Sequence, residues 1–166
     1  MKESESKEIT TEDGHHYFPI YINMQNKRCV VYGGGAVAAR RVSALLRFGA
    51  QVTVYAIRIG ADITELKKAY SKRLFLYEQP YEPGIPAADF VLSCVDDRET
   101  DKAIWQECRE RGVPVNIASD QSMCDFFFPA LVEEEDLVIG ICSGGRDHRK
   151  VRLLAEKLRG WLGAGD

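Results

Sequence analysis

The stretch of sequence that decides the fold covers residues 28–55 and reads RCVVYGGGAVAARRVSALLRFGAQVTVY. Residues 29–32 form a short apolar run with two adjacent valines, which is typical of a strand buried on both faces of a sheet. Residues 36–48 then place apolar side chains at helical spacing, and Gly49 is a natural end for that helix. Residues 51–55 form another apolar run. The stretch therefore predicts one strand–helix–strand unit.

A G-x-G-x-x-A motif, formed by Gly33, Gly35 and Ala38, lies between the first strand and the helix. In dinucleotide-binding folds the first glycine permits a tight turn, the second lets a pyrophosphate approach the backbone, and the third small residue lets helix and strand pack closely. The helix start also offers free N–H groups to phosphates. Because the motif follows a predicted strand and opens a predicted helix, we prefer dinucleotide binding to a purely structural turn. The residues expected to hold the pyrophosphate are Gly33, Gly34, Gly35, Ala36 and Val37.

The end of the second strand bears on the choice of cofactor. An acid usually stands there, about 20 residues after the glycines, and binds the ribose of NAD. This sequence has no acid at residues 55–57, and Arg58 lies just beyond. An arginine there is able to bind the 2′-phosphate of NADP, but it is equally typical of a solvated surface. The residues at this position therefore leave the choice between NAD and NADP open.

The rest of residues 17–117 continues the alternation of strands and helices. Asp62 and Glu65 resemble a capping box that opens a short helix. Further strands are expected at residues 74–77, 90–94 and 113–117, and a helix at residues 100–111 before Gly112. Alternation of this kind predicts a parallel sheet covered on both faces. Residues 17–23 contain Pro19 and are expected to form an edge strand or a docking arm.

The two ends of the chain have a different character. Residues 1–16 are polar, and we expect a disordered leader there. Residues 126–132 and 137–142 resemble two strands around an acidic turn at residues 133–136, and a basic helix follows. The predicted fold class is therefore α/β: a Rossmann-type open parallel sheet over residues 17–117, with a small strand-and-helix extension over residues 118–166. That extension is too small for its own core and should pack on the first domain or on a second subunit.

Polar residues after the fourth and fifth strands are candidates for a site, since open α/β sheets bind ligands at their carboxyl ends. Asp96 and Asp97 border that edge, although capping of the next helix is an alternative role for them. Asp120 is the acid best placed for proton transfer. His148 is a second candidate, because the pKa of a histidine is ordinarily near neutral.

A cluster of basic residues follows Gly144 and Gly145 at the start of the last helix. Glycines before a helix start favour anion binding. The alternative is a solvated face that balances the acidic turn at residues 133–136. The cluster consists of Arg146, His148, Arg149, Lys150 and Arg152.

Composition excludes several classes of function. The net charge is -3, from 22 Lys plus Arg and 25 Asp plus Glu among 166 residues, so binding of nucleic acid by charge alone is not expected. No apolar run approaches the ~18 residues of a membrane helix, and no secretory leader opens the chain. The five cysteines form no C-x-x-C pair, so we expect no metal site and a cytoplasmic protein with reduced thiols.

Four segments in order resemble the precorrin-2 dehydrogenase family, which also forms the N-terminal part of siroheme synthases. They are YFPIYINMQNKRCVVYGGGAVAARR, ADFVLSCVDD, VPVNIASDQSMCDFFFPA and LVIGICSGG, within residues 17–158. The resemblance implies a homodimer that oxidises precorrin-2 to sirohydrochlorin with NAD+. It also gives the basic cluster a role, because precorrin-2 is a tetrapyrrole with eight carboxylates, and Arg146, Arg149 and Lys150 suit carboxylates.

The sequence departs from the family at three places. After S-G-G the family often reads T-S-P-x-L-A-R, whereas in residues 146–152 of this chain only the final Arg152 matches. The family usually has an aspartate three residues after the asparagine of the fifth strand, where this chain has Ser119, with Asp120 next to it. Many members also continue into a further helical domain beyond the position of Asp166, and some insert iron. We therefore expect dehydrogenation rather than iron insertion. The alternatives are a non-catalytic dinucleotide-binding scaffold and a dehydrogenase for an unrelated small substrate.

Overall fold

The computed structural model describes residues 17–163, so the leader expected at residues 1–16 lies outside the described residues. Five parallel strands form one sheet in the order β3-β2-β1-β4-β5. The strands are β1 (Arg28–Tyr32), β2 (Gln51–Ala56), β3 (Leu74–Glu78), β4 (Phe90–Ser93) and β5 (Val115–Ile117). The helices between them are α1 (Ala36–Arg47), α2 (Ala61–Ala69) and α3 (Arg98–Arg111). The predicted Rossmann-type sheet is confirmed.

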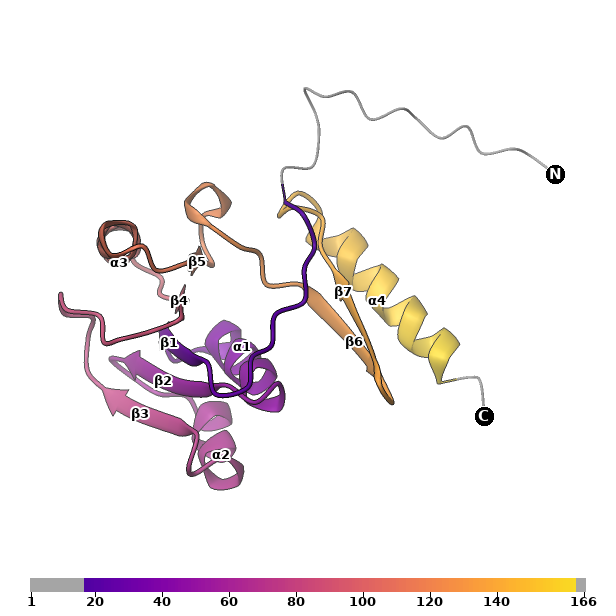
Figure 1. Ribbon diagram of the computed structural model, residues 1–166, viewed down its shortest axis with the longest axis horizontal. Helices are drawn as coiled ribbons and strands as arrows, with labels where there is room; N and C mark the ends of the chain where they lie inside the picture. Colours follow the sequence, from indigo (N-terminus) through magenta and orange to yellow (C-terminus); the bar gives the residue numbers. More distant parts are fainter. Residues whose placement is uncertain (1–16, 164–166) are drawn as a thin grey trace.

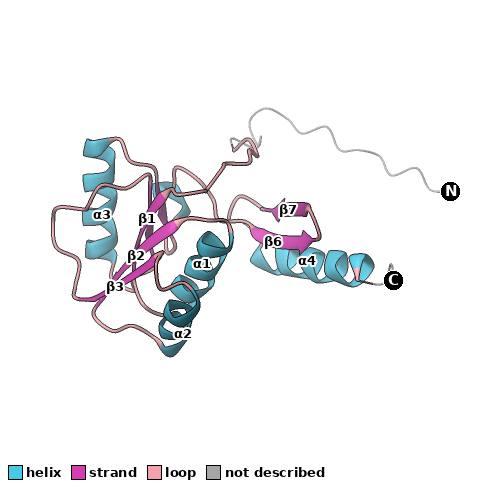
Figure 2. Ribbon diagram, turned by 60° about the horizontal axis from the view of Figure 1, so that its bottom comes forward, coloured by secondary structure: helices cyan, strands magenta, loops and turns pink. Residues whose placement is uncertain are grey.

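Both faces of this sheet are covered, as the apolar strands predicted. Along β1, Val31 packs in the core on the side of α1 and α2, whereas Val30 packs with Ile104 of α3 on the other side. Figures 1 and 2 show α1 and α2 on one face of the sheet and α3 on the opposite face. Alternate residues of a strand point to opposite faces, so a strand between two layers must be apolar throughout.

The helix ends differ in how they are capped. Asp97 caps α3, and Gly112 ends it in the left-handed conformation at φ 64°. The capping box predicted at Asp62 and Glu65 is wrong, because α2 begins after Gly60 and has no side-chain cap. Glu65 instead forms an ion pair with Lys68 at 2.6 Å. Glu65 is the fifth residue of α2, beyond the third position from which the acid of a capping box reaches the cap, and it lies one helical turn from Lys68.

The extension contains η1 (Gln121–Met123), the antiparallel strands β6 (Ala130–Glu134) and β7 (Leu137–Ile141), and α4 (His148–Leu162). Helix α4 packs on β6, where the Arg159 guanidinium donates to the carbonyl of Leu131 at 2.8 Å. Within residues 129–163 only Val132 and Ala155 are buried. The phenylalanines at 126–128 precede β6 and pack their rings into the two core clusters of the main sheet.

The segment before β1 forms no strand and docks through two tyrosines. The Tyr17 hydroxyl donates to the carbonyl of Cys124 at 2.9 Å, and the Tyr21 hydroxyl donates to the carbonyl of Val138 at 2.8 Å. An ion pair of 2.6 Å between Arg47 at the end of α1 and Glu133 of β6 adds a second link between the sheet and the extension. Of the two structures predicted for residues 17–23, the docking arm is the one observed.

No helix within residues 17–163 is long and apolar enough to cross a membrane. In the same range no group of three or more His, Cys, Asp or Glu side chains is placed to hold a metal ion. All five cysteines are free thiols, and Cys142 is exposed.

Candidate functional site

The glycine loop lies where the strand order of the sheet reverses, between β1 and its neighbour β4. Open parallel sheets bind ligands beside such a switch point, outside the carboxyl ends of the strands. Gly33 has a φ of 111°, which favours glycine, and its N–H donates to the carbonyl of Tyr55 at 2.8 Å. A Cβ atom on Gly33 would overlap with the carbonyl oxygen of Cys94. Gly33 therefore makes the tight turn that the motif predicts.

The next two glycines serve different purposes. The carbonyl of Gly34 accepts a hydrogen bond from the N–H of Gly60 at 2.9 Å, and a Cβ atom on Gly34 would overlap with the carbonyl of Arg58. Gly34 is therefore needed for packing against the loop after β2. A Cβ atom on Gly35 would meet nothing within 4 Å, and Gly35 is exposed. The open side of Gly35 leaves the backbone accessible to a ligand.

The start of α1 is suited to an anion. Its cap residue is Gly35, which offers no side-chain hydrogen bond, and its first turn contains no acidic residue. The other α-helices of residues 17–163 carry a carboxylate at their start: Asp62 in α2, Asp97 before α3 and Asp147 before α4. Free N–H groups and the positive end of the helix dipole attract negative charge. The residues at α1 therefore fit the pyrophosphate of a dinucleotide.

The three residues that follow Gly35 also fit this role. Ala38 is completely buried, so the helix approaches the sheet closely, as its place in the motif predicts. Val37 leaves 41% of its surface exposed at the start of the same helix. Ala36 is exposed as well, so the first turn of α1 is open to solvent.

An acid does stand beside the end of β2, although it belongs to the neighbouring strand. Glu78 ends β3, pairs in register with Ala56 of β2, and accepts a hydrogen bond from the N–H of Ile59 at 3.2 Å. Arg58 is exposed in the same loop. The sequence along β2 does not point to Glu78, because Ala56 and Glu78 are far apart in the chain and meet only through the pairing of β2 with β3.

The acids after β4 divide into one capping residue and one exposed residue. The carboxylate of Asp97 accepts from the N–H of Thr100 at 2.8 Å and from its hydroxyl at 2.5 Å, and these hydrogen bonds lower the pKa of Asp97. Helix capping, the alternative considered for this pair, is thus the role observed for Asp97. Asp96 is exposed at the carboxyl edge. A contact of either residue with a cofactor stays a prediction.

Asp120 is engaged in its own turn. It caps η1 and accepts from the hydroxyl of Ser122 at 2.6 Å and from its N–H at 2.9 Å. The hydrogen bonds from Ser122 lower the pKa of Asp120, which makes its carboxylate a weaker proton acceptor near neutral pH. Its predicted role in proton transfer remains untested.

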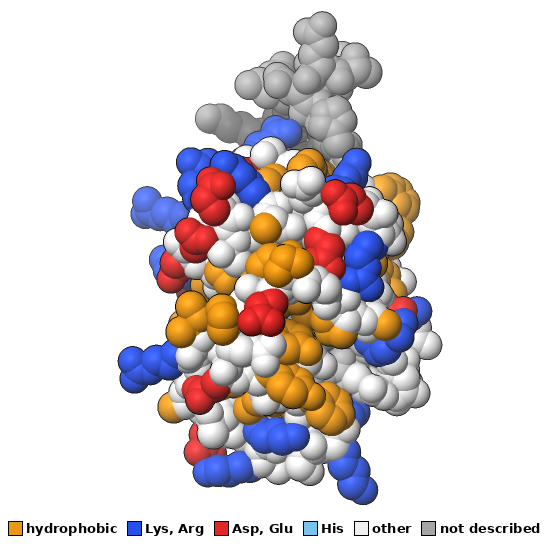
Figure 3. Space-filling model, turned by 90° about the vertical axis from the view of Figure 1, so that its left-hand side faces the viewer, with side chains coloured by type: hydrophobic (Ala, Val, Ile, Leu, Met, Phe, Trp, Pro, Cys, Tyr) orange, Lys and Arg blue, Asp and Glu red, His pale blue; other side chains and the backbone are white. Residues whose placement is uncertain are grey.

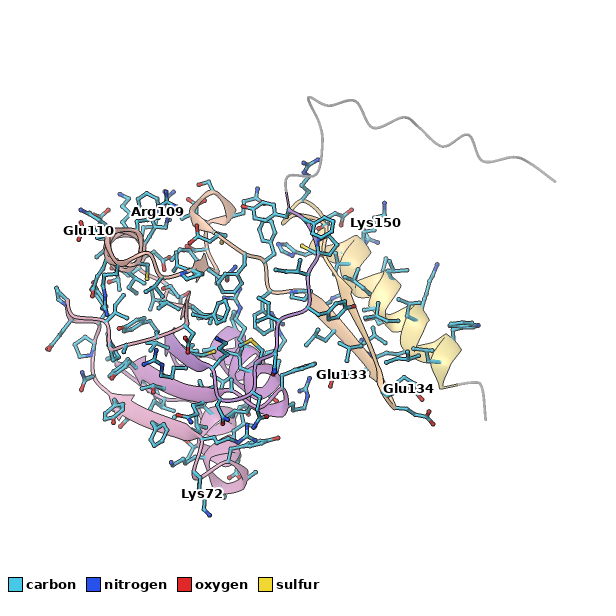
Figure 4. All side chains as sticks on the ribbon, viewed as in Figure 1. Lys72, Arg109, Glu110, Glu133, Glu134 and Lys150 are labelled. Atoms are coloured by element: carbon cyan, nitrogen blue, oxygen red, sulfur yellow. The ribbon has the colours of Figure 1, made fainter. Side chains whose placement is uncertain are left out.

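The basic cluster starts α4 and is exposed at Arg146, His148, Arg149 and Lys150. A Cβ atom on Gly145 would overlap with the side-chain oxygen of Gln121, so the loop before α4 lies against η1 and brings the cluster toward Asp120. Figure 4 shows Lys150 at one end of the extension and Glu133 and Glu134 at the other. The acidic turn therefore does not neutralise the cluster, contrary to the alternative interpretation.

A buried carboxylate near the same edge was not anticipated. Asp101 in α3 is 1% exposed and binds two hydroxyl groups, from Ser93 at 2.6 Å and from Ser119 at 2.5 Å. In sequence Asp101 is one acid among many in a polar helix. Only the packing of α3 on β4 and β5 reveals it, because Ser93 ends β4 and Ser119 lies in the turn after β5.

The carboxyl edge as a whole combines apolar and charged groups. The arrowheads of β2 and β3 point to the left in Figure 1, so Figure 3, which faces that side, looks onto this edge. Hydrophobic side chains occupy much of the middle of the face, and charged side chains of both signs lie around them. An apolar surface with a few polar groups is typical of sites for organic ligands.

Comparisons with known proteins agree with this geometry. The chain is 30% identical over 148 residues to the siroheme synthase of Nitrosomonas eutropha. The aligned region covers 89% of this chain and 31% of that protein. It is 34% identical over 147 residues to the siroheme synthase of Neisseria meningitidis serogroup C, with 89% and 30% covered. The chain thus spans about a third of the length of these relatives. The predicted resemblance to siroheme synthases is confirmed.

A solved structure, SirC, precorrin-2 dehydrogenase, has the same fold, with a TM-score of 0.68 at 22% sequence identity, covering 90% of this chain and 71% of that one. The family described as "Putative NAD(P)-binding" matches residues 20–130, which hold the glycine loop, the whole parallel sheet and its three helices. The chain therefore belongs to this NAD(P)-binding family.

Proposed function

We propose that this chain is an NAD(P)-dependent precorrin-2 dehydrogenase, which oxidises precorrin-2 to sirohydrochlorin in siroheme biosynthesis. One observation carries the proposal: the start of α1 lacks both a side-chain cap and an acid and lies beside the open face of Gly35. This feature occurs in a chain whose relatives are named siroheme synthases.

The bound dinucleotide would supply the acceptor for a hydride. Gly33, Gly34, Gly35, Ala36 and Val37 would hold its pyrophosphate. Glu78 is placed beside the end of β2, where an acid binds the ribose of NAD, and this supports NAD as the cofactor. Arg58 lies in the same loop and would favour NADP instead. Comparing the affinity for both dinucleotides in Glu78→Gln and Arg58→Ala decides which residue sets the choice.

The substrate side of the site would be formed by the basic cluster. Arginine and lysine bind carboxylates through charge-assisted hydrogen bonds, and the tetrapyrrole carries many of them. Arg146, Arg149 and Lys150 are exposed, and the contact between Gly145 and Gln121 places their loop beside the segment that follows β5. His148 is exposed and Asp120 is half-buried, and both would take part in proton transfer. Asp96 and Asp97 would border the cofactor.

The division into domains and the assembly belong to the same proposal. Residues 17–117 would bind the dinucleotide, and the extension would pair with a second copy of the chain. The extension has two strands and one helix and buries only Val132 and Ala155, so it is only marginally stable by itself. Leu137, Leu154 and Trp161 of this unit are exposed and would be covered in a homodimer. The free thiols support a cytoplasmic location.

The direct test is anaerobic incubation with precorrin-2 and either NAD+ or NADP+, with absorbance of the reduced cofactor as the readout. Formation of reduced cofactor with sirohydrochlorin as product is the expected result. Dinucleotide binding without turnover would instead support the second candidate, a non-catalytic scaffold, which the engagement of Asp120 in its own turn favours.

A further inference from the structure

Asp101 presents a buried carboxylate with no cationic partner. Its side chain is 1% exposed, and none of the ion pairs within residues 17–163 includes it. Oδ1 accepts a hydrogen bond from the Ser93 hydroxyl at 2.6 Å, and Oδ2 accepts one from the Ser119 hydroxyl at 2.5 Å. Removing a carboxylate from water without pairing its charge costs free energy. The burial of Asp101 therefore needs a structural or functional explanation.

The two serine partners differ in exposure. Ser93 is completely buried at the end of β4, so its hydroxyl only fixes the carboxylate. Ser119 lies in the exposed turn after β5. The Ser119 hydroxyl therefore connects a buried carboxylate to the carboxyl edge of the sheet. Strands β1, β4 and β5 are adjacent, so Ser119 lies roughly 10 Å from the glycine loop, which is two strand spacings.

A hydroxyl that donates to a carboxylate is a stronger proton acceptor, because its own proton has a base to move to. Proton transfer at this edge of the sheet therefore does not require a carboxylate at the surface. Asp120, one residue further on, is less suited to this task, because hydrogen bonds from Ser122 lower its pKa. The hydroxyl that reaches the edge and the carboxylate to which it donates thus belong to different residues.

We propose that Ser119 and Asp101 accept the proton released in the dehydrogenation, with Ser119 as the catalytic residue and Asp101 as its positioning residue. The inference rests on the proposed function. A C–H bond of the substrate breaks and its electron pair leaves as hydride to NAD(P)+. A second hydrogen leaves the substrate as a proton to Ser119 Oγ, while the Ser119 proton moves to Asp101 Oδ2. The substrate loses two electrons and two hydrogens, and Asp101 later releases its proton to water.

The test compares Ser119→Ala, Ser119→Thr and the control Ser43→Ala. Ser43 carries a hydroxyl on α1 that accepts from Arg47 at 3.3 Å, and it makes no hydrogen bond with Asp101 or Ser119. The assay follows reduced cofactor under anaerobic conditions with precorrin-2. We expect Ser119→Ala to lower kcat by about 100-fold or more with KM for the dinucleotide unchanged. Ser119→Thr, which keeps the hydroxyl, should stay within about tenfold of the wild type, and Ser43→Ala should match it.

A second variant addresses the carboxylate. Asp101→Asn keeps the shape and one acceptor oxygen but cannot take the proton, so it should lower kcat as Ser119→Ala does. Because Asp101 is also in the first turn of α3, the thermal unfolding midpoint and the dinucleotide Kd of each variant are measured in parallel. A kcat loss with both quantities unchanged separates proton transfer from a structural role.

The possible failures are distinguishable. A wild-type chain that binds a dinucleotide but does not turn over precorrin-2 overturns the proposed function and the pair with it. An active wild type with Ser119→Ala within twofold of its kcat overturns the pair and leaves the proposed function standing. Equal loss in Ser119→Ala and Ser119→Thr also overturns it, because the hydroxyl would then be irrelevant.

Discussion

Gly34 lies so close to Arg58 that a Cβ atom on the glycine would overlap with the carbonyl oxygen of the arginine. The neighbouring Gly35 has open space where its Cβ atom would be. Two adjacent glycines in one loop thus have separate reasons to be glycine. The first lets two loops of the protein approach each other, and the second leaves room for a ligand.

This difference predicts opposite outcomes for two alanine substitutions. Gly34→Ala forces the loop after β2 away and should lower the free energy of unfolding by about 1–3 kcal/mol. Gly35→Ala fits the backbone, since the φ of Gly35 is -85°, and should change stability by less than about 1 kcal/mol. Its methyl group should nevertheless weaken dinucleotide binding by roughly tenfold or more, because the pyrophosphate approaches there.

Chemical denaturation and calorimetric titration of both variants check this pair, and each serves as the control for the other. A destabilised Gly35→Ala, or a Gly35→Ala variant that binds dinucleotides as the wild type does, would contradict the assignment of the open face to the ligand.

Glu107 in α3 should make stability depend on pH. Its carboxylate accepts from the Tyr81 hydroxyl at 2.8 Å and from the N–H of Ile85 at 2.6 Å, and it pairs with Arg111 at 3.0 Å. Burial raises the pKa of Glu107, but these hydrogen bonds outweigh burial and hold the pKa below the ordinary 4.5. A carboxyl with a lowered folded-state pKa stabilises the fold above its unfolded pKa and loses that contribution as the pH falls through the folded value.

The variant Glu107→Gln should therefore lose about 1.5–3 kcal/mol at pH 7, as expected for hydrogen bonds to a charged group. Its deficit relative to the wild type should shrink as the pH falls below 4.5, the ordinary value of the group. Urea unfolding at several pH values between 3 and 7 measures both free energies. A deficit that is independent of pH would show that the charge of Glu107 does not account for the stability of its contacts with Tyr81 and Ile85.

The cysteines should differ sharply in reactivity. Burial, followed by the charge of Asp89, raises the pKa of Cys29 to about 12, and burial, followed by the charge of Glu107, raises that of Cys108 to about 12. Thiols react as thiolates, so these two should resist labelling. Cys142 is exposed and should be labelled first. Mass spectrometry after brief thiol labelling should find one modified site, absent in Cys142→Ser. A second site labelled at the same rate would refute this order.

The proposed homodimer predicts twice the 18.7 kDa mass of one chain in light scattering. Leu154 and Trp161 are 44% and 74% exposed on α4, so Leu154→Arg and Trp161→Arg should place charges in the interface and yield monomers. Glu156→Arg changes an exposed position on the same helix and should leave the dimer intact. A monomeric wild type would reject the interface.

The sequence predicted the order of strands and helices over residues 28–117 because its signals are local. Apolar runs such as residues 29–32 mark buried strands, and Gly49 and Gly112 mark helix ends within a few residues of where they occur. The same is true of the strand pair before α4. Local signals failed for the start of α2, where the acid at Glu65 binds a lysine rather than the backbone.

The site was only partly predictable for the opposite reason. The glycine motif is contiguous, so the tight turn at Gly33 could be predicted from spacing. Glu78 reaches the end of β2 only through strand pairing, and Asp101 meets Ser119 only because α3 covers β4 and β5. Contacts between residues that are distant in sequence leave no pattern within one segment, so they appear only when the chain is folded.

The central claim is that the start of α1 holds a dinucleotide. The most direct measurement is an NMR titration of the backbone amides with NAD+ and with NADP+. We predict that the amides of Gly34, Gly35, Ala36 and Val37 shift most with at least one of the two, and that the shifts disappear in Gly35→Val. If neither dinucleotide moves these amides, or if the shifts centre elsewhere on the chain, the claim is wrong.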